Sequence, residues 1–505
     1  MMGKSRIKLA AKFTVFVLVT CFFVNMVNEW LKPKYYYNQT WPATNTFLDF
    51  YKLEKNSVDV LFFGSSHAVC SFNPQVLYDT YGITSYNLGS EQQSMVVSYF
   101  WLQEALKYQQ PKVVVLDTYM LHKFGAVFVY NEMNCSEGAV RKAMDCMRPS
   151  LTKWQDAKEI ARIDPTQNAL SYFLPNLRYH TRWTELGEDD FTESAMIDHG
   201  GIKGFTVLGG GVDESQTYTP FTEADAATAE ADAMVGSAAE YLDKIMSLCS
   251  EKGIDLILTN IPCAEPIGRY ASTKQYADAH GVPYYDFNEE TYYYAINYDP
   301  TRDLLSHPSY FGAEKITNFF GQLLRETYGV APREDASFIK SGENYQHQLK
   351  NIQLQYASDS VQLLDLLQDD TYTLFVFAPT SYSSYLSDDV MNCLFALGFT
   401  TELRDMPDGW HYCAVKDGNQ ITEKITDQDF SFSGPFRDGL SHYSFCVDTT
   451  LMIPESQTYS LKIDGAEYGR RADGIQIVVY DRDLKTVVTK VTLNTNNEEA
   501  TMTHN

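Results

Sequence analysis

Residues 58–69 read VDVLFFGSSHAV. The apolar, β-branched run before Gly64 predicts a buried strand, and the glycine predicts a tight turn after it. A serine after such a turn lies exposed at the sheet edge, beside a helix N-terminus that favours developing negative charge. Serines also cap helices in many turns of this kind, so the short motif leaves catalysis and capping equally open for Ser66.

Strand and helix patterns continue along the chain after this stretch. Further strands are expected at 83–88, 111–117 and 253–260, and helices at 94–109 and from Thr222 to Gly253. Alternating strands and helices predict an α/β fold with a parallel sheet covered on both faces, and chemistry at the carboxyl ends of its strands. An insertion at about 121–221, with a glycine cluster at 200–211, is expected to be a lid or a substrate-shaping element, or else disordered.

A histidine lies near the end of this region, in RDLLSHPSYFGAEKI (302–316). A nucleophilic serine needs a base, and the base needs an acid that orients it. The chain supplies these three roles in the order Ser66 as nucleophile, Asp303 as acid and His307 as base. The occurrence of both motifs at the proper ends of one α/β unit predicts a serine nucleophile, although a lone loop histidine is usually a surface residue.

The N-terminus contains an uncharged run, FTVFVLVTCFFVNMVN (13–28), after four basic residues, Lys4, Arg6, Lys8 and Lys12. The run extends past Lys12 and through Leu31 to the length of about 20 residues that a bilayer requires. Residues 1–34 are therefore expected to form a cytoplasmic tip and a single transmembrane signal anchor, with the body outside the cytoplasm. A cleaved signal peptide and a buried core helix are the two alternatives. The first lacks a small-residue cleavage site, and the basic flank argues against the second. Residues 35–57 are expected to form a stalk.

Composition limits the classes of function. The 505 residues are 44% apolar and 21% charged, which is typical of globular proteins. The net charge of −25 argues against a nucleic-acid partner, which requires a basic surface. The nine cysteines form no C-x-x-C pair, and Cys135 and Cys146 are open to a disulfide or to free thiols. Neither a metal site nor a cofactor is predicted.

The last third of the chain has a different pattern. Residues 332–372 are expected to form a linker helix, and residues 373–495 a smaller α+β or mostly-β domain. Its expected strands lie at 373–379, 411–415, 459–463, 475–481 and 487–493, and its expected helix at 388–397. Residues 496–505 are expected to be a frayed tail.

Residues 58–325 resemble the SGNH/GDSL hydrolase superfamily, within a domain expected at 35–331. The resemblance implies an SGNH-type sheet in which Ser66 is the nucleophile and His307 the base. Gly89 in YNLGSEQ (86–92) matches the second block, so the resemblance implies an oxyanion hole made by the amides of Gly89 and Ser66. Ser65 replaces the usual Asp of the family, a variation similar to membrane-anchored DltD-like and acyltransferase-linked members.

Two family positions depart from the pattern. Asp303 stands one residue farther from His307 than in the usual Asp-x-x-His, which leaves a Ser–His dyad as an alternative. The oxyanion-stabilising Asn of the third block has no counterpart after the 111–117 strand. Thr118, Tyr119 and Asn260 are candidate replacements, each with a structural role as the alternative. His180 and Arg182, in the insertion segment LRYHTRW (177–183), are candidate anion or sugar contacts, or else solvated lid residues.

Residues 373–495 resemble the ILEI/PANDER-like domain, through the stretch LKIDGAEYGRRADGIQIVVYDRDLKTVV (461–488). That resemblance implies binding of carbohydrate or of a protein partner, without catalytic residues.

Together these features predict a membrane-anchored, extracytoplasmic serine esterase or O-acyltransferase. It would act on a cell-surface polysaccharide or teichoic-acid-like polymer through an acyl-enzyme at Ser66, and the resemblance implies a membrane-bound O-acyltransferase partner. The alternative is a catalytically weak or inactive protein of the same fold that binds surface glycan or assists assembly. The missing Asn and the longer Asp–His spacing favour that alternative.

Overall fold

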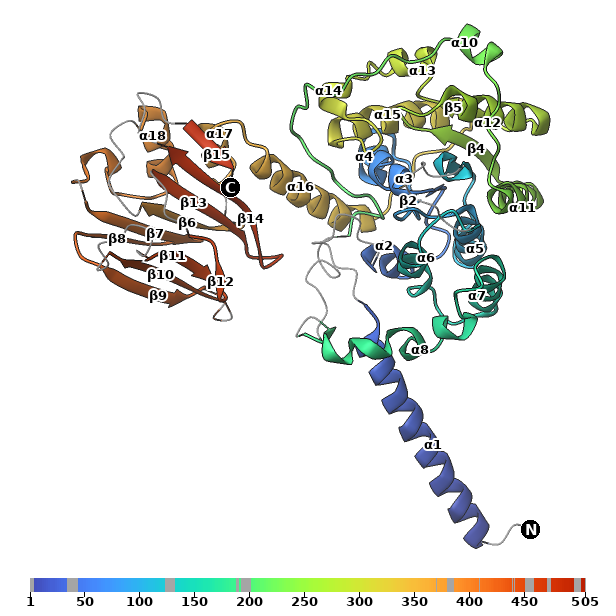
Figure 1. Ribbon diagram of the computed structural model, residues 1–505, viewed down its shortest axis with the longest axis horizontal. Helices are drawn as coiled ribbons and strands as arrows, with labels where there is room; N and C mark the ends of the chain where they lie inside the picture. The colour runs from blue at the N-terminus through green and yellow to red at the C-terminus, as the bar shows by residue number, and fades with distance from the viewer. Residues whose placement is uncertain are drawn as a thin grey trace. The chain divides into compact units, whose positions relative to one another are not determined.

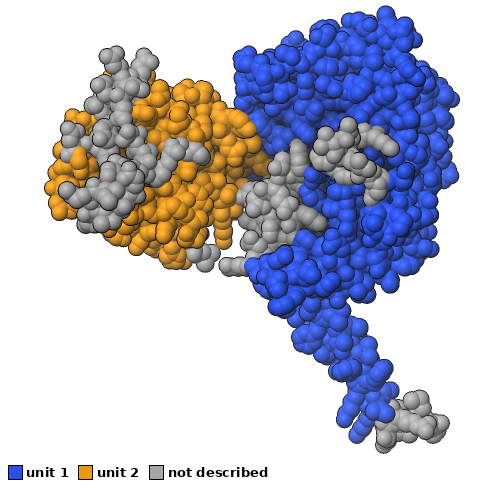
Figure 2. Space-filling view, viewed as in Figure 1, with its two compact units in different colours: residues 1–346 blue, residues 347–505 orange. Residues whose placement is uncertain are grey.

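The structure is a computed structural model of the 505-residue chain. It describes residues 4–33, 44–122, 132–187, 190–191, 201–368, 370–378, 386–407, 409–437, 439, 441–449, 458–469, 474–494 and 501–504. The chain divides into two compact units, residues 1–346 and 347–505 (Figure 2). Their boundary falls inside α16 (Ser337–Gln355), within the range predicted to be a linker helix. Residue 34 of the predicted anchor segment, 35–43 of the predicted stalk, and 123–131, 188–189 and 192–200 of the predicted insertion lie outside the described residues.

The first unit begins with the apolar helix α1 (Lys4–Leu31; Figure 1). Its 24 residues from Lys8 to Leu31 are long and apolar enough to cross a membrane. At 1.5 Å per residue they exceed the hydrocarbon thickness of about 30 Å. Phe13, Phe16 and Phe22 are all exposed, as expected of a helix that has no protein core around it. The length and composition of α1 are compatible with a single-pass anchor.

The sheet of the first unit has five parallel strands in the order β2-β1-β3-β4-β5. The strands are β1 (Val60–Phe63), β2 (Ser85–Asn87), β3 (Val113–Asp117), β4 (Asp255–Asn260) and β5 (Tyr284–Asp286). Four of them coincide with predicted strands. The sequence did not predict β5, which has only three residues and no apolar run to mark it.

Helices cover both faces of this sheet, as the alternating pattern predicts. Successive side chains of a strand point to opposite faces. Leu61 and Phe63 therefore join a core with α5 and α11, while Val60 and Phe62 join a second core with α4 and α15. The helices of this unit are α2 (Thr44–Phe50), α3 (Ser66–Ser71), α4 (Pro74–Tyr81), α5 (Met95–Ala105), α6 (Glu137–Met144), α7 (Leu151–Ile163), α8 (Asn176–Tyr179), α10 (Glu223–Thr228), α11 (Gly236–Lys252), α12 (Ile267–His280), α13 (Glu290–Ala295), α14 (Pro300–Asp303) and α15 (Tyr310–Glu326), with 3₁₀ turns η1 (Tyr119–Leu121), η2 (Ala169–Tyr172) and η3 (His180–Thr184).

Two expectations about the first unit are wrong. The helix predicted from Thr222 to Gly253 is two helices, α10 and α11. The chain leaves helical geometry at Ala229 because the backbone N–H of Asp232 bonds to Gly268 and that of Val235 bonds to Leu121. The described part of the predicted stalk belongs to the domain, since α2 inserts the rings of Phe47 and Phe50 into the core.

The predicted insertion has two described parts with different surroundings. Residues 132–191 carry α6 to η3, of which α6 and α7 pack beside α5, and α8 and η3 lie against the end of α1. Residues 201–213 instead run past α3, where the N–H of Thr206 bonds to the carbonyl of Val69. Gly204 has a φ of +84°, and a Cβ on it would lie 1.9 Å from the carbonyl oxygen of Asn87. Only glycine fits this crossing.

The described residues of the second unit form two antiparallel sheets, the end of α16 and three short helical elements. A six-stranded sheet has the order β15-β14-β13-β6-β7-β8 and a four-stranded sheet the order β12-β11-β10-β9. One core fills the space between the sheets, and another lies between the larger sheet and the helices. The elements are β6 (Tyr372–Ala378), β7 (His411–Asp417), β8 (Gln420–Thr426), β9 (Phe430–Pro435), β10 (His442–Asp448), β11 (Thr458–Ile463), β12 (Ala466–Glu467), β13 (Ile475–Asp481), β14 (Thr486–Asn494), β15 (Thr501–His504), α17 (Ser360–Asp365), α18 (Asp388–Ala396) and η5 (Leu403–Asp405).

The tail at 496–505 is not simply frayed. Residues 501–504 form β15, which pairs antiparallel with β14, and the His504 ring bonds to the carbonyl of Ala357. Residues 495–500 lie outside the described residues. All nine cysteines are free thiols, including Cys135 and Cys146.

Candidate functional site

Ser66 follows the carboxyl end of β1 and is the first residue of α3. Gly64 makes the turn with a φ of +148°, and a Cβ there would lie 2.5 Å from the Cβ of Asp117. Ser65 caps α3, since its hydroxyl accepts the N–H of His67 at 3.2 Å. Because Gly64 makes the turn and Ser65 caps the helix, Ser66 is the first helical residue. The Ser66 side chain is almost buried, with 9% exposure.

Asp117, the last residue of β3, accepts hydrogen bonds from this turn. Its Oδ2 accepts the Ser65 hydroxyl at 3.0 Å and the Ser65 backbone N–H at 3.3 Å. Burial raises the pKa of Asp117 to about 6, against the hydrogen bonds from Ser65, which act in the opposite direction. Sequence reasoning assigned Asp117 no role. Its place at a strand end beside a tight turn was the available signal.

The His307 imidazole reaches Ser66 from a distant part of the chain. Its Nε2 lies 2.8 Å from the Ser66 Oγ, across a separation of 241 positions. The loop that carries it runs between α14 and α15, and its residues Leu304 and Ser306 have φ values of +63° and +64°. Two contacts hold this strained loop: the Ser306 N–H bonds to the Pro262 carbonyl, and the Tyr298 hydroxyl bonds to Leu304.

Burial lowers the pKa values of the two histidines near Ser66, His307 and His67. It lowers the pKa of His307 below the ordinary value, while the charge of Glu91 acts in the opposite direction. It lowers the pKa of His67 further, with the nearby His307 acting in the same direction. The two rings meet edge to face with centroids 5.2 Å apart, and His67 also packs on Tyr119. Neutral His307 is the form that can accept a proton from Ser66.

Asp303 lies close to His307 in sequence but bonds elsewhere. Its Oδ2 accepts the backbone N–H of Asp299 at 2.7 Å and a hydrogen bond from Lys315 Nζ. Its Oδ1 is buried and has no hydrogen-bond partner among the described residues. The structure therefore brings Ser66 and His307 together and leaves the Asp303 carboxylate off the imidazole.

Three of the predicted oxyanion donors, Gly89, Thr118 and Asn260, are engaged in protein contacts. The Gly89 N–H bonds to the Asn87 side chain at 3.0 Å. The Thr118 N–H and hydroxyl both bond to the Thr259 carbonyl, at 2.8 and 3.0 Å. The Asn260 amide donates to Glu265 at 3.1 Å. The Ser66 N–H, at the first turn of α3, lies where helical N–H groups lack intrahelical acceptors.

Acidic side chains surround Asn260 at the ends of β4 and β5. Burial raises the pKa of Glu265 to about 7 and also raises that of Asp286. Both stay within a hydrogen-bonded network that includes Arg269 and Asn288. No group of three His, Cys, Asp or Glu side chains with metal-binding geometry occurs in the described part of the chain.

His180 and Arg182 lie at the end of α1. The Arg182 guanidinium donates to the carbonyl of Leu31 at 2.8 Å and pairs with Asp190 at 2.7 Å. His180 is exposed at the start of η3. Arg182 therefore caps the carboxyl end of α1, where cations are favoured, and both of these contacts hold it there instead of at the Ser66–His307 pair.

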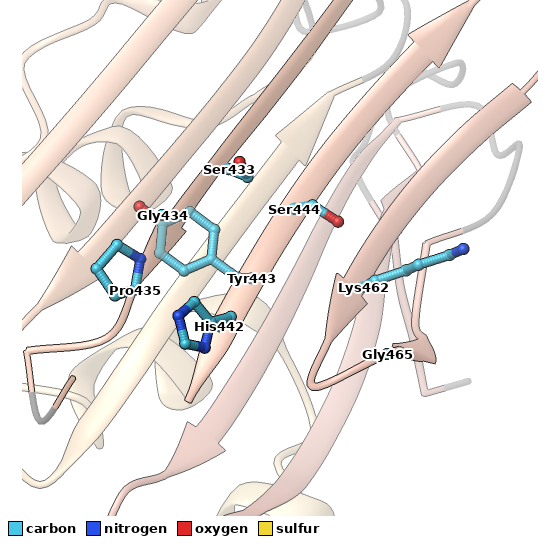
Figure 3. Close-up of a pocket in the computed structure, with 8 residues that line it drawn as sticks. All are labelled: Ser433, Gly434, Pro435, His442, Tyr443, Ser444, Lys462 and Gly465. Carbon is cyan, nitrogen blue, oxygen red and sulfur yellow. The ribbon is translucent and has the colours of Figure 1, made fainter. Parts of the chain in front are cut away.

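The second unit carries a shallow pocket of about 440 Å³ on its four-stranded sheet (Figure 3). Strands β9, β10 and β11 and the turn after β11 contribute the lining residues, which are Ser433, Gly434, Pro435, His442, Tyr443, Ser444, Lys462 and Gly465. The Tyr443 ring covers its cross-strand partner Gly434, where a Cβ would lie 2.8 Å from the tyrosine oxygen. The pocket thus combines an aromatic ring with hydroxyl, imidazole and ammonium groups.

No known protein-family model matches this chain, and no curated protein matches it in sequence.

Proposed function

We propose that this protein is a membrane-anchored serine esterase or O-acyltransferase of the SGNH type. The observation that carries the proposal is the 2.8 Å contact between Ser66 Oγ and His307 Nε2. A serine on a helix start after a parallel strand, bonded to a neutral and largely buried imidazole, has the arrangement of an activated nucleophile.

The proposed reaction uses a Ser–His dyad. His307 Nε2 takes the Ser66 proton as Oγ attacks the acyl carbonyl, and the Ser66 N–H faces the resulting oxyanion. The intermediate collapses when the leaving alcohol takes the proton back from His307, which leaves an ester on Ser66. Water or a sugar hydroxyl then attacks that ester, with His307 again accepting the proton. The bond from the acyl carbon to Ser66 Oγ breaks, Oγ takes the proton back from His307, and the acyl group is released as an acid or as a new ester.

The proposed substrate is an acylated cell-surface polysaccharide or a teichoic-acid-like polymer. Anchoring by α1, with the N-terminus in the cytoplasm, would keep Ser66 on the same side of the membrane as such a polymer. Transfer would follow from a partner such as a membrane-bound O-acyltransferase that supplies the acyl group. We further propose that residues 373–495 are an ILEI/PANDER-like domain that binds glycan or a partner, with the pocket beside Tyr443 as the candidate site.

A second candidate function is an inactive SGNH-fold protein that binds glycan or assists assembly at the surface. Two observations favour it: the Gly89 amide is occupied by Asn87, and the Asp303 carboxylate pairs with Lys315 instead of His307.

The test is covalent labelling of the full-length chain in lipid nanodiscs by a fluorophosphonate, read as intact mass. Wild type is expected to gain one adduct, and Ser66→Ala none. Ser71→Ala is the matched control, because Ser71 lies on the same short helix and its hydroxyl has no hydrogen-bond partner in the described structure. That variant is expected to label as wild type does.

Further outcomes separate the two candidates. His307→Gln is expected to slow labelling by about 100-fold or more, the scale of a lost general base. Folded wild type that gains no adduct, or Ser66→Ala that labels equally, would reject the esterase and favour the binding protein. Release of a preformed acyl-enzyme in water alone indicates an esterase, and release only with an added oligosaccharide indicates a transferase.

A further inference from the structure

The described parts of residues 170–191, which are 170–187 and 190–191, expose several large apolar side chains. Five apolar side chains are 40–70% exposed in this stretch: Leu170, Leu174, Leu177, Trp183 and Phe191. The three leucines lie in η2, in the connection after it and in α8. A soluble surface rarely exposes so many large apolar groups together.

Two tyrosines of the same stretch, Tyr172 and Tyr179, face the protein interior. Arg141 is almost completely buried, and its guanidinium lies over the Tyr172 ring at 3.9 Å and near the Tyr179 ring at 5.5 Å. The Tyr179 hydroxyl donates to the buried carboxylate of Asp145 at 2.9 Å. These contacts fix the tyrosines inward, so the leucines between them cannot rotate into the core.

This stretch is also bonded to the last turn of α1. The Asn176 N–H donates to the Asn28 side chain at 3.0 Å, and Arg182 donates to the Leu31 carbonyl at 2.8 Å. The rings of Trp30 and Phe191 meet edge to face at 5.3 Å. Figure 1 shows α8 beside the body-proximal end of α1. Residues 170–191 therefore lie at the level where a membrane-spanning α1 would leave the bilayer.

We infer that the exposed side chains of residues 170–191 form a membrane-contact surface, which lies in the interfacial layer of the leaflet from which α1 emerges. Leucine, phenylalanine and tryptophan gain by burial at the boundary between headgroups and acyl chains, and tryptophan prefers that depth. Arg178 and Arg182 at its edge suit the polar headgroups. The inference rests on α1 spanning the membrane and is independent of catalysis at Ser66.

This contact surface would give the body a second attachment besides α1. A single helix lets a domain tilt and rotate freely above the bilayer. Five further apolar groups on the membrane hold the α6–η3 region against it, and hence fix the tilt of the first unit.

The test is the depth of single nitroxide labels on the full-length chain in phosphatidylcholine nanodiscs. The four cysteines that are not buried, Cys21, Cys146, Cys393 and Cys446, are first replaced by Ala. Labels at Leu177→Cys and Trp183→Cys report on the membrane-contact surface, and Phe16→Cys reports on α1. Val212→Cys and Tyr294→Cys are matched controls: both are exposed apolar positions, 61% and 64%, near α14 and α13, which Figure 1 shows at the opposite end of this unit from α1.

Relaxation by oxygen and by a water-soluble nickel chelate distinguishes lipid, water and protein surroundings. Labels 177 and 183 are expected to resemble label 16, with several-fold greater access to oxygen than to nickel, and labels 212 and 294 to show the reverse. Nickel access at 177 and 183 equal to the controls would overturn the inference. Low access to both reagents would mean that a protein surface covers the site, such as a second copy, and would also overturn it. Water-like behaviour of label 16 would reject α1 as an anchor and the membrane-contact surface with it.

Discussion

The carboxylate of Asp303 accepts a hydrogen bond from the Lys315 ammonium group on α15, although Asp303 lies only four positions before His307. Asp303 is fully buried, and its second oxygen has no partner in the described structure. The arrangement assigns Asp303 to the join between α14 and α15 and keeps its carboxylate away from the imidazole. Asp303 should therefore matter for stability and little for the reactivity of Ser66.

Lys315→Met is expected to lower the free energy of unfolding by about 1–3 kcal/mol, because it leaves a buried carboxylate without its cation. Chemical denaturation measures the loss. Lys274→Met is the control, since Lys274 pairs with the exposed Asp278 and is expected to change little. Folded Asp303→Asn is expected to keep a Ser66 labelling rate close to that of wild type. A loss of about 100-fold there would show that Asp303 does orient His307.

The labelling rate of Ser66 is expected to depend on pH through His307. Burial lowers the pKa of His307 below 6.5, so the reactive neutral imidazole persists below that pH. The rate should therefore stay level from about pH 8 to about pH 6.5 and fall about tenfold per pH unit only once His307 is protonated. Because the charge of Glu91 favours the protonated form, Glu91→Gln should move this fall to lower pH. An acid limb centred above pH 6.5 would contradict the prediction.

Asp117 is expected to make stability depend on pH. Its pKa is raised to about 6 from 3.8, so the folded state binds the proton more tightly than the unfolded state does. The folded state therefore loses stability as pH rises from about 4 to about 6, and the cost is fully present above that. Asp117→Asn stays neutral and should gain about 2–3 kcal/mol relative to wild type between about pH 4 and pH 7. Urea titrations at several pH values measure this gain, and a difference that stays constant with pH would refute it.

Gly204→Ala is expected to destabilise the first unit by about 3 kcal/mol or more, because its Cβ would enter the space of the Asn87 carbonyl oxygen. Gly253→Ala is the matched control. Gly253 also has a positive φ, +66°, but nothing lies within 4 Å of the position that a Cβ would occupy there. That variant should lose only about 1–2 kcal/mol from backbone strain. Equal losses of melting temperature for the two variants would show that the contact with the Asn87 carbonyl relaxes and adds no loss of stability.

Local sequence signals predicted much of the architecture. The apolar run before Gly64 is β1, the basic flank and long apolar run are α1, and the Thr222–Asp225 capping box does begin a helix. Such features depend on residues within a few positions of one another, so propensity, periodicity and capping suffice. The three-residue β5 and the polar strands β8 to β10 carry weaker local patterns, and the sequence reasoning missed them.

The side-chain partners of the site were decided by the tertiary structure. The chain order of Ser66, Asp303 and His307 named three candidates, but only folding brought Ser66 and His307 together and placed Asp303 on Lys315. The Gly89 amide donates a hydrogen bond to Asn87, and Arg182 donates one to the end of α1. Sequence spacing sets which groups are available, whereas hydrogen bonds form wherever packing brings donor and acceptor within about 3 Å of each other. For this protein the sequence therefore determined four of the five strands of the parallel sheet and the apolar N-terminal helix, and the packing of distant elements decided which polar groups meet.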